Sequence, residues 1–149
     1  MKQMKIRKLR ATMRQLQRAL GWQWKNDAAC CGITVAQCHS LMEIGAKEEI
    51  TLNELASKFG LDISTLSRTV EGMVKTGLVE RQTKPEDRRY LVITMTEKGK
   101  EIYDRINQTF DHYYSEALTT IPRDKQEQVI ESLELLAKAL TSCSEANTT

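Results

Sequence analysis

Residues 51–77 contain two short amphipathic helical patterns separated by only about three residues, and this spacing constrains the fold more than any other feature. Thr51 and Glu54 have the spacing of a capping box at the start of the first pattern, and Gly60 ends it. The second pattern ends at Gly77. Two short helices joined by a tight glycine-containing turn form a helix-turn-helix, so the sequence predicts that motif here.

A pair of strands is predicted directly after the helix-turn-helix. Residues 78–81 read as a first strand and residues 89–95 as a second strand that is rich in β-branched and aromatic side chains, and residues 82–88 between them are polar and contain a proline. This pattern predicts a β-hairpin with a charged tip, which completes a winged helix. The whole chain of 149 residues holds 2 Pro and 7 Gly, too few for a sandwich or barrel of short strands joined by tight turns.

Four further helices are predicted around the winged helix. Apolar side chains near the N-terminus recur at alternating steps of three and four residues, the narrow stripe of a helix that packs on a partner helix. Capping residues and one-sided patterns predict the other elements: a loop at 26–32, a helix from Thr34 that stops near Gly45, a long helix after Thr96, a sixth helix after Pro122 and a frayed tail at 141–149. The predicted fold is mainly α, with six helices and a small β-hairpin wing.

The net charge of +2 conceals an alternation of basic and acidic stretches. Residues 1–25 carry eight Lys/Arg and no acid, and residues 26–57 carry one base and five acids. Residues 58–100 carry nine bases and six acids, and residues 101–149 carry four bases and nine acids. Contact with a polyanion would therefore involve particular faces, although charge alone fits a solvated helix surface equally well.

The second helix of the helix-turn-helix carries hydroxyl side chains and one long cation opposite its apolar side. Short side chains let a helix approach the floor of the major groove, and Arg68 can form a bidentate pair with guanine. The plainer alternative is that serine and threonine are merely tolerated on a solvated surface. A tight turn before the helix and a basic hairpin after it favour DNA contact, and the predicted contact residues are Ser64, Thr65, Ser67, Arg68 and Thr69.

The predicted hairpin adds four cations to this surface, Arg81, Lys84, Arg88 and Arg89, and the last three are predicted to contact DNA. An arginine at the tip of a hairpin can enter a narrow minor groove. Asp87 is out of place against a polyanion, so we expect it to pair with Arg88 or Arg89 and to orient the guanidinium group. An exposed surface ion pair that contributes little is the alternative.

Three stretches of this region resemble the MarR family of bacterial transcriptional regulators: 61–70, 75–81 and 87–99. An Asp-x-Arg wing, here Asp87 to Arg89, followed by Thr-x-x-Gly, here Thr96 to Gly99, is characteristic of that family. The resemblance implies a homodimer in which the first, fifth and sixth helices interlock and two winged helices bind an inverted-repeat operator. It also implies recognition-helix contacts between Ser64 and Thr69 and wing contacts by Arg88 and Arg89.

On this interpretation the chain is a single MarR-like domain over 1–149, with a DNA-binding part at 34–99 and a dimerisation part at 1–26 and 100–140. The predicted function is that of a sequence-specific regulator, a repressor by resemblance, that binds a pseudo-palindromic double-stranded operator as a homodimer. Family resemblance also implies release of DNA when a small-molecule or metal effector binds. We expect a cytoplasmic protein that is not an enzyme, requires no cofactor and has no membrane association.

A cluster of thiols departs from the generic family pattern. Cys30, Cys31, Cys38 and His39 fall within ten residues, and Cys31 precedes a predicted helix N-terminus, which would lower its pKa and favour the thiolate. These residues could bind Zn(II), Cu(I) or arsenite as an effector, or react with an oxidant. His112 could supply a further ligand. Alternatively, Cys38 lies on the buried stripe of its helix and the remaining residues are structural.

Two other functions compete with the regulator. A thiol-based redox enzyme would use the cysteines with His39 as nucleophile and base, but the sequence has no phosphate loop and no HExxH or Gly-x-Ser-x-Gly motif. A winged helix can also serve only as a protein-interaction module. Such a module would not need a hydroxyl-lined helix together with Arg68, Arg88 and Arg89.

Overall fold

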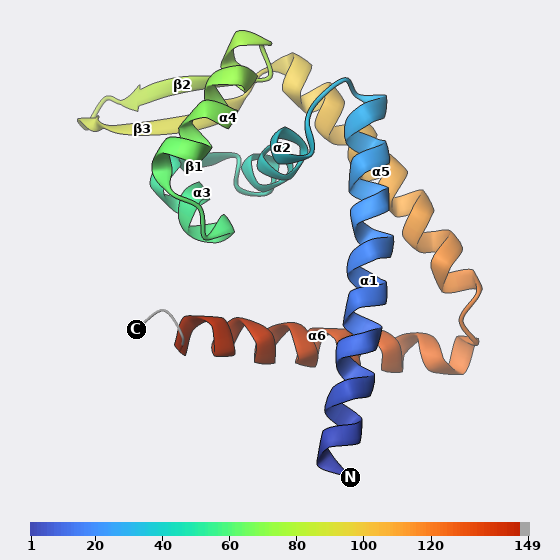
Figure 1. The fold of residues 1–149 in the computed structure, drawn as a ribbon. Helices are drawn as coiled ribbons and strands as arrows, with labels where there is room; N and C mark the ends of the chain where they lie inside the picture. Colours follow the sequence, from blue (N-terminus) through green and yellow to red (C-terminus); the bar gives the residue numbers. More distant parts are fainter. Residues whose placement is uncertain (147–149) are drawn as a thin grey trace. The chain divides into compact units, whose positions relative to one another are not determined.

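The computed structural model describes residues 1–146, with all of their side chains except those of Arg88 and Tyr90. Its elements are α1 (Lys2–Cys30), α2 (Val35–Lys47), β1 (Glu49–Thr51), α3 (Leu52–Phe59), α4 (Ile63–Lys75), β2 (Val79–Lys84), β3 (Asp87–Met95), α5 (Glu97–Thr119) and α6 (Arg123–Ala146). The mainly α fold with a small wing is therefore confirmed (Figure 1). The chain divides into two compact units, Met1–Asn107 and Gln108–Thr149, and α5 begins in the first and continues into the second.

The helix-turn-helix forms for the local reasons that the sequence indicates. The Thr51 hydroxyl accepts a hydrogen bond from the Glu54 amide at 3.1 Å and caps α3. Gly60 then adopts φ 60°, in the left-handed region that costs glycine little, and lets the chain leave α3 sharply. Asp62 occupies the N-cap position of α4. The predicted motif is confirmed.

The structure also confirms the capping box that opens α2. The Thr34 hydroxyl accepts from the Gln37 amide at 3.1 Å, and the Gln37 side chain accepts from the Thr34 amide at 3.1 Å. Gly45 does not end this helix, contrary to the prediction. A Cβ atom at Gly45 would lie 2.2 Å from the Tyr103 ring, so glycine lets that ring of α5 pack directly against the backbone of α2.

Three other sequence predictions are wrong in detail. Residues 26–30 belong to α1 rather than to a loop, and Asp27 and Ala28 are buried there, so packing extends the helix beyond its apolar stripe. Residues 141–146 continue α6 instead of fraying, and residues 147–149 of the predicted tail lie outside the described part. The polar segment of the hairpin is shorter than expected, because β2 and β3 extend through most of it.

The sheet has a third strand that the sequence did not indicate. β3 lies in the middle, paired antiparallel with β2 on one side and β1 on the other. Glu49 of β1 and Glu80 of β2 both pair with Thr94, so they flank it at the same level of the sheet. The three-residue β1 is too short to show a period, and pairing with β3 is what defines it.

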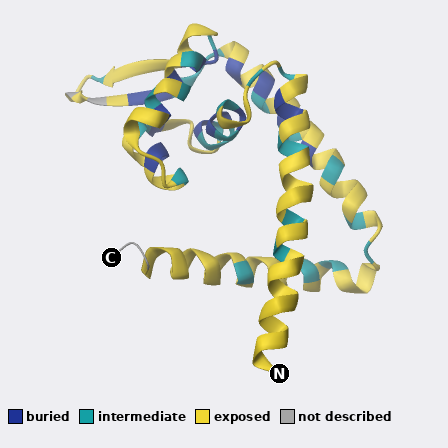
Figure 2. Ribbon diagram, viewed as in Figure 1, coloured by how far each residue is buried: buried dark blue, intermediate teal, exposed yellow. Residues whose placement is uncertain are grey.

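The core of the first unit lies between α2, α3, α4 and the sheet (Figure 2). Each of these elements contributes aliphatic side chains that are at most 1% exposed: Leu41, Ile44, Ile50, Leu55, Leu66, Val70, Met73, Leu78, Val79 and Ile93. The N-terminal end of α5 closes this core, because the Thr96 hydroxyl accepts from the Gly99 amide at 3.0 Å and donates to the Gly77 carbonyl at 2.5 Å. This core positions α4 and the wing.

The second unit is helical and buries little. The Gln126 side chain donates to the carbonyls of Leu118 and Ile121 at 2.9 and 3.1 Å, which holds the turn between α5 and α6. No described residue of α6 is buried. Its large apolar side chains are at least 40% exposed at Ile130, Leu133, Leu135 and Leu140. An apolar helix face left in this state needs a partner to cover it.

Candidate nucleic-acid interface

α4 buries one side and presents polar groups on the other. Leu66, Val70 and Met73 lie in the core, which agrees with the one-sided pattern of the sequence. On the remaining surface, Ser64, Thr65 and Arg68 are exposed, and Ser67 and Thr69 are half-buried. The helix therefore offers one guanidinium group and short hydroxyl side chains to solvent, and such a surface can enter a major groove. Contact of these five residues with DNA stays a prediction.

Ser64 is engaged within the chain at the start of α4. Its hydroxyl donates to the Asp62 carboxylate at 2.5 Å, and this hydrogen bond is the main reason that the Asp62 pKa is held below its ordinary value. The carboxylate therefore stays ionised at the helix N-terminus. The Asp62 carboxylate and a DNA phosphate compete for the same place at the helix N-terminus and for the same hydroxyl hydrogen of Ser64. Ser64 can therefore donate to DNA only after its hydroxyl turns away from Asp62.

The wing carries Arg89 in an open position. Its side chain is 95% exposed, and its Nε atom lies 3.8 Å from an Asp87 carboxylate oxygen. The same oxygen accepts a hydrogen bond from the Arg89 amide at 3.0 Å. Asp87 thus folds back on the backbone that carries the guanidinium group, as expected for an orienting residue, while Arg89 remains accessible. The predicted pairing with Arg88 concerns a side chain outside the described residues.

Lys84 does not extend freely from the wing. Its ammonium nitrogen lies 3.0 Å from a Glu49 carboxylate oxygen, and its side chain is 41% exposed. The hydrogen bond and the charge of Glu49 raise the Lys84 pKa, and the charges of Glu86 and Glu54 add to this effect. In this structure the ammonium group is therefore directed onto β1.

The cysteines of the predicted sensor differ widely in exposure. Cys30 is exposed and Cys31 half-buried at the end of α1, whereas Cys38 is fully buried in α2. Among the described residues, no group of three or more His, Cys, Asp and Glu side chains is placed to hold a metal ion. The structure therefore does not assemble Cys30, Cys31, Cys38 and His39 into one ligand set.

The expected low pKa of Cys31 is wrong. Burial is the largest effect and raises the Cys31 pKa, although the Arg105 guanidinium opposes it through its charge and a hydrogen bond. Cys31 occupies the C-cap of α1, where the helix dipole disfavours a thiolate. Burial also raises the pKa of Cys38 to about 12, so this thiol stays protonated at neutral pH.

His39 lies in an aromatic environment. Its ring stacks on Trp24 with centroids 3.9 Å apart and meets the edge of Phe59 at 6.4 Å. Burial lowers the His39 pKa, against the opposing charge of Glu43. The neutral imidazole thus fixes the packing of α1 on α2. The other histidine, His112, is exposed on α5, where its ring lies 3.5 Å from the Glu116 carboxylate, and its role as a further ligand stays a prediction.

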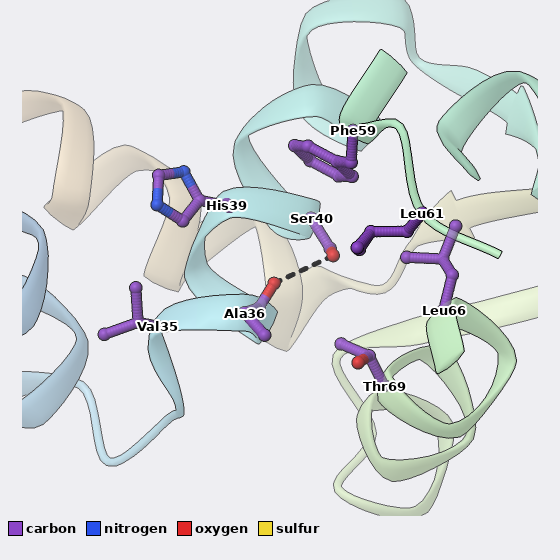
Figure 3. A pocket seen from close by; sticks show the side chains of 8 residues that line it. All are labelled: Val35, Ala36, His39, Ser40, Phe59, Leu61, Leu66 and Thr69. Atoms are coloured by element: carbon purple, nitrogen blue, oxygen red, sulfur yellow. Dashed lines mark hydrogen bonds between the residues drawn. The ribbon is translucent and has the colours of Figure 1, made fainter. Parts of the chain in front are cut away.

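Sequence reasoning missed a cavity that borders α4. It has a volume of about 400 Å³ and lies between α2, the turn after α3, and α4 (Figure 3). The Ser40 hydroxyl at its edge donates to the Ala36 carbonyl at 2.8 Å. Most of the lining is apolar, and the lining residues are Val35, Ala36, His39, Ser40, Phe59, Leu61, Leu66 and Thr69. Because they are scattered over three elements, no local pattern in the sequence indicates them.

Comparison with known proteins supports this description. Residues 33–91 match the model of the MarR family. Over 107 residues, the chain is 25% identical to the HTH-type transcriptional regulator BilQ of Clostridium symbiosum, covering 72% of this chain and 74% of the relative. It is 31% identical over 100 residues to the HTH-type transcriptional regulator SarZ of Staphylococcus haemolyticus, covering 62% of each chain.

Solved structures share the fold. A MarR transcriptional regulator from Methanosarcina mazei Go1 aligns with a TM-score of 0.78 at 21% identity, over 91% of this chain and 97% of the other. A mutant MarR from E. coli complexed with operator DNA aligns with a TM-score of 0.72 at 24% identity, over 91% of this chain and 95% of the other. No helix within residues 1–146 has the length and apolar character of a membrane span. Over residues 33–91 the chain is thus similar to the MarR family, and solved MarR structures share its fold.

Proposed function

We propose that the protein is a transcriptional regulator, and specifically a repressor, that binds a pseudo-palindromic operator in double-stranded DNA as a homodimer. The observation that carries the proposal is that α4 and the wing, which follow one another in the chain, both expose groups that can contact DNA. α4 buries its apolar side and turns Thr65 and Arg68 to solvent, and the hairpin that follows holds Arg89 almost fully exposed. The operator complex of the E. coli MarR mutant, which shares this fold, supports the same use of the motif.

Two exposed apolar helix faces support the homodimer. Along α1, Ile6 and Leu9 are 47% and 45% exposed, in a stripe with heptad-like steps. In the second unit, Leu133 and Leu140 of α6 are 47% and 46% exposed. Neither face is covered by the described residues of its own unit, and a second copy of the chain would cover both. The division into a DNA-binding part at 34–99 and a dimerisation part at 1–26 and 100–140 belongs to this proposal.

The test of function is selection of genomic fragments by the purified protein, followed by affinity measurements on the recovered site. We expect one inverted repeat to bind at least 1000-fold more tightly than random duplex, with half-sites about one helical turn apart. Replacing Arg68 with alanine should cost about 1–3 kcal/mol at one or two base positions and relax the preference there. Equal affinity for all duplexes, or a monomer in solution, would contradict the proposal and favour a protein-interaction module.

Thiol chemistry is a narrower part of the proposal. Cys30 and Cys31 are adjacent and reachable at the end of α1, and the Arg105 guanidinium partly offsets the burial that raises the Cys31 pKa. These two residues, rather than the buried Cys38, would bind Zn(II), Cu(I) or arsenite, or react with peroxide.

Operator affinity should be titrated with each of these four reagents. We expect at least one to weaken binding tenfold or more in the wild type, because a ligand that prefers the unbound conformation shifts the population away from DNA. The double variant Cys30→Ser/Cys31→Ser should not respond, whereas Cys143→Ser should respond like the wild type. If all four reagents leave the wild-type affinity unchanged, the cysteines are structural.

A further inference from the structure

The position of Lys84 carries an inference that rests on the proposed function. Lys84 lies on β2, near the tip of the wing, and its ion-pair partner Glu49 lies on β1, at the opposite edge of the sheet. The central strand β3 separates the two strands, so the side chains join the outer edges of the sheet. The wing is thereby tied to the segment that leads into α3.

The surroundings of this ion pair are acidic. Glu54, at the start of α3, binds the Lys47 ammonium at 3.0 Å and also contributes its charge to the environment of Lys84. Glu86, in the turn of the wing, adds a further negative charge. Lys84 is thus attracted toward the protein by three carboxylates, whereas Arg89 is 95% exposed beside Asp87. Lys84 is therefore held in an ion pair on the sheet, whereas Arg89 extends into solvent.

We propose that Glu49 is a positioning residue that withholds Lys84 from the DNA backbone, so that phosphate contact by the wing depends on Arg89 and not on Lys84. A lysine bound to a carboxylate must give up that partner before it neutralises a phosphate. Exposed ion pairs of this kind are worth a few-fold in an equilibrium constant. Glu49 thereby sets the affinity and the salt dependence of operator binding.

The chain offers a matched control for charge. Glu80 pairs with the same residue of β3 as Glu49, Thr94, from the other side. Residues paired across strands point to the same face of a sheet, so Glu49 and Glu80 place a negative charge at the same level and on the same face. The Glu80 carboxylate accepts a hydrogen bond from the Gln82 side chain at 3.5 Å, whereas Lys84 pairs with Glu49. Glu80→Gln therefore removes an equal charge and leaves Lys84 bound.

The experiment is a double-mutant cycle on the selected operator, read as affinity against salt concentration. We expect Glu49→Gln to tighten binding about two- to fivefold and to steepen the log–log salt slope by about 0.9, the value for one further phosphate contact. Lys84→Met should change the slope little in the wild type and should reverse the gain in the Glu49→Gln background. Glu80→Gln should leave the slope unchanged.

Two results would overturn the inference. One is an equal loss of slope on Lys84→Met in both backgrounds, which would make Lys84 a direct contact that Glu49 does not restrain. The other would come from NMR of the Lys84 side chain without DNA. If the ion pair forms, the Cε and Hε resonances should shift on Glu49→Gln and not on Glu80→Gln. Absence of that shift shows that the ion pair does not form, whatever the DNA measurements give. Failure of the wild type to select any operator, by contrast, refutes the regulator itself.

Discussion

Replacing Arg89 with alanine is expected to weaken operator binding by about 1.5–3 kcal/mol, the range for a hydrogen bond to a charged group. The wing holds this guanidinium group 95% exposed, with Asp87 bonded to the backbone beneath it, so the side chain meets DNA with few competing contacts. The loss should be similar on specific and random duplex, and the log–log salt slope should fall by about 0.9. Fluorescence anisotropy at several salt concentrations measures both quantities.

Two further variants define what Arg89 contributes. Arg89→Lys keeps the charge but loses the planar fork, so it should restore the salt slope without restoring the full affinity. Lys138→Ala removes the same charge from an exposed position on α6 and should change neither quantity. An Arg89→Ala protein that binds with unchanged affinity and unchanged salt slope would show that the wing does not touch DNA.

Replacing Gly99 with alanine is expected to destabilise the protein by about 3 kcal/mol or more, at the upper end of the range for overpacking. A Cβ atom there would lie 2.0 Å from the Leu78 carbonyl oxygen and 3.1 Å from its carbon. These are backbone atoms next to β2, so no side-chain rotation relieves the clash. The start of α5 must move, and this strains the hydrogen bonds through which Thr96 joins Gly99 to Gly77.

The melting temperature of the Gly99→Ala protein should fall by roughly 10 °C for a chain of this size. Gly21→Ala is the matched control, because a Cβ atom at Gly21 meets nothing within 4 Å and the residue lies inside α1. That substitution should stabilise the protein by about 0.5–1 kcal/mol. Equal melting temperatures for the Gly99→Ala variant and the wild type would show that α5 does not pack on β2 as described.

Gly99 also gives the Thr-x-x-Gly pattern of the wing region a physical meaning. Thr96 caps α5 and ties it to the end of α4 through Gly77, and Gly99 lets α5 approach the Leu78 carbonyl. The pattern therefore allows the first turn of α5 to pack closely against the winged helix. It fixes the position of the strand that leads to the wing.

The sequence predicts well those features that depend on residues close together in the chain. The caps at Thr34 and Thr51, the left-handed turn at Gly60 and the buried side of α4 depend on neighbours within about one helical turn. Each of them is confirmed by hydrogen bonds or by burial. The ion pair between Asp87 and Arg89, two residues apart, is also local, and the sequence predicted it as one of two possible partners.

Failures occurred where distant residues decide the outcome. Gly45 is predicted to be a helix stop, but it lies inside α2, where the ring of Tyr103, 58 positions away by the numbering, packs against it. The pKa of Cys31 was expected to fall, but burial and the C-terminal end of α1 oppose the thiolate. The cavity beside α4 and the ion pair between Lys84 and Glu49 join elements that no local pattern connects.

The sequence by itself determined the order of helices and hairpin, the caps that bound them and the side of each helix that faces inward. Those features depend on side-chain periodicity and on hydrogen bonds between residues a few positions apart. Only the tertiary structure decided that Lys84 is ion-paired while Arg89 is exposed, which thiols are buried and where an added Cβ atom would clash. Those properties depend on burial and on charges brought close by folding, and neither is encoded at any single position.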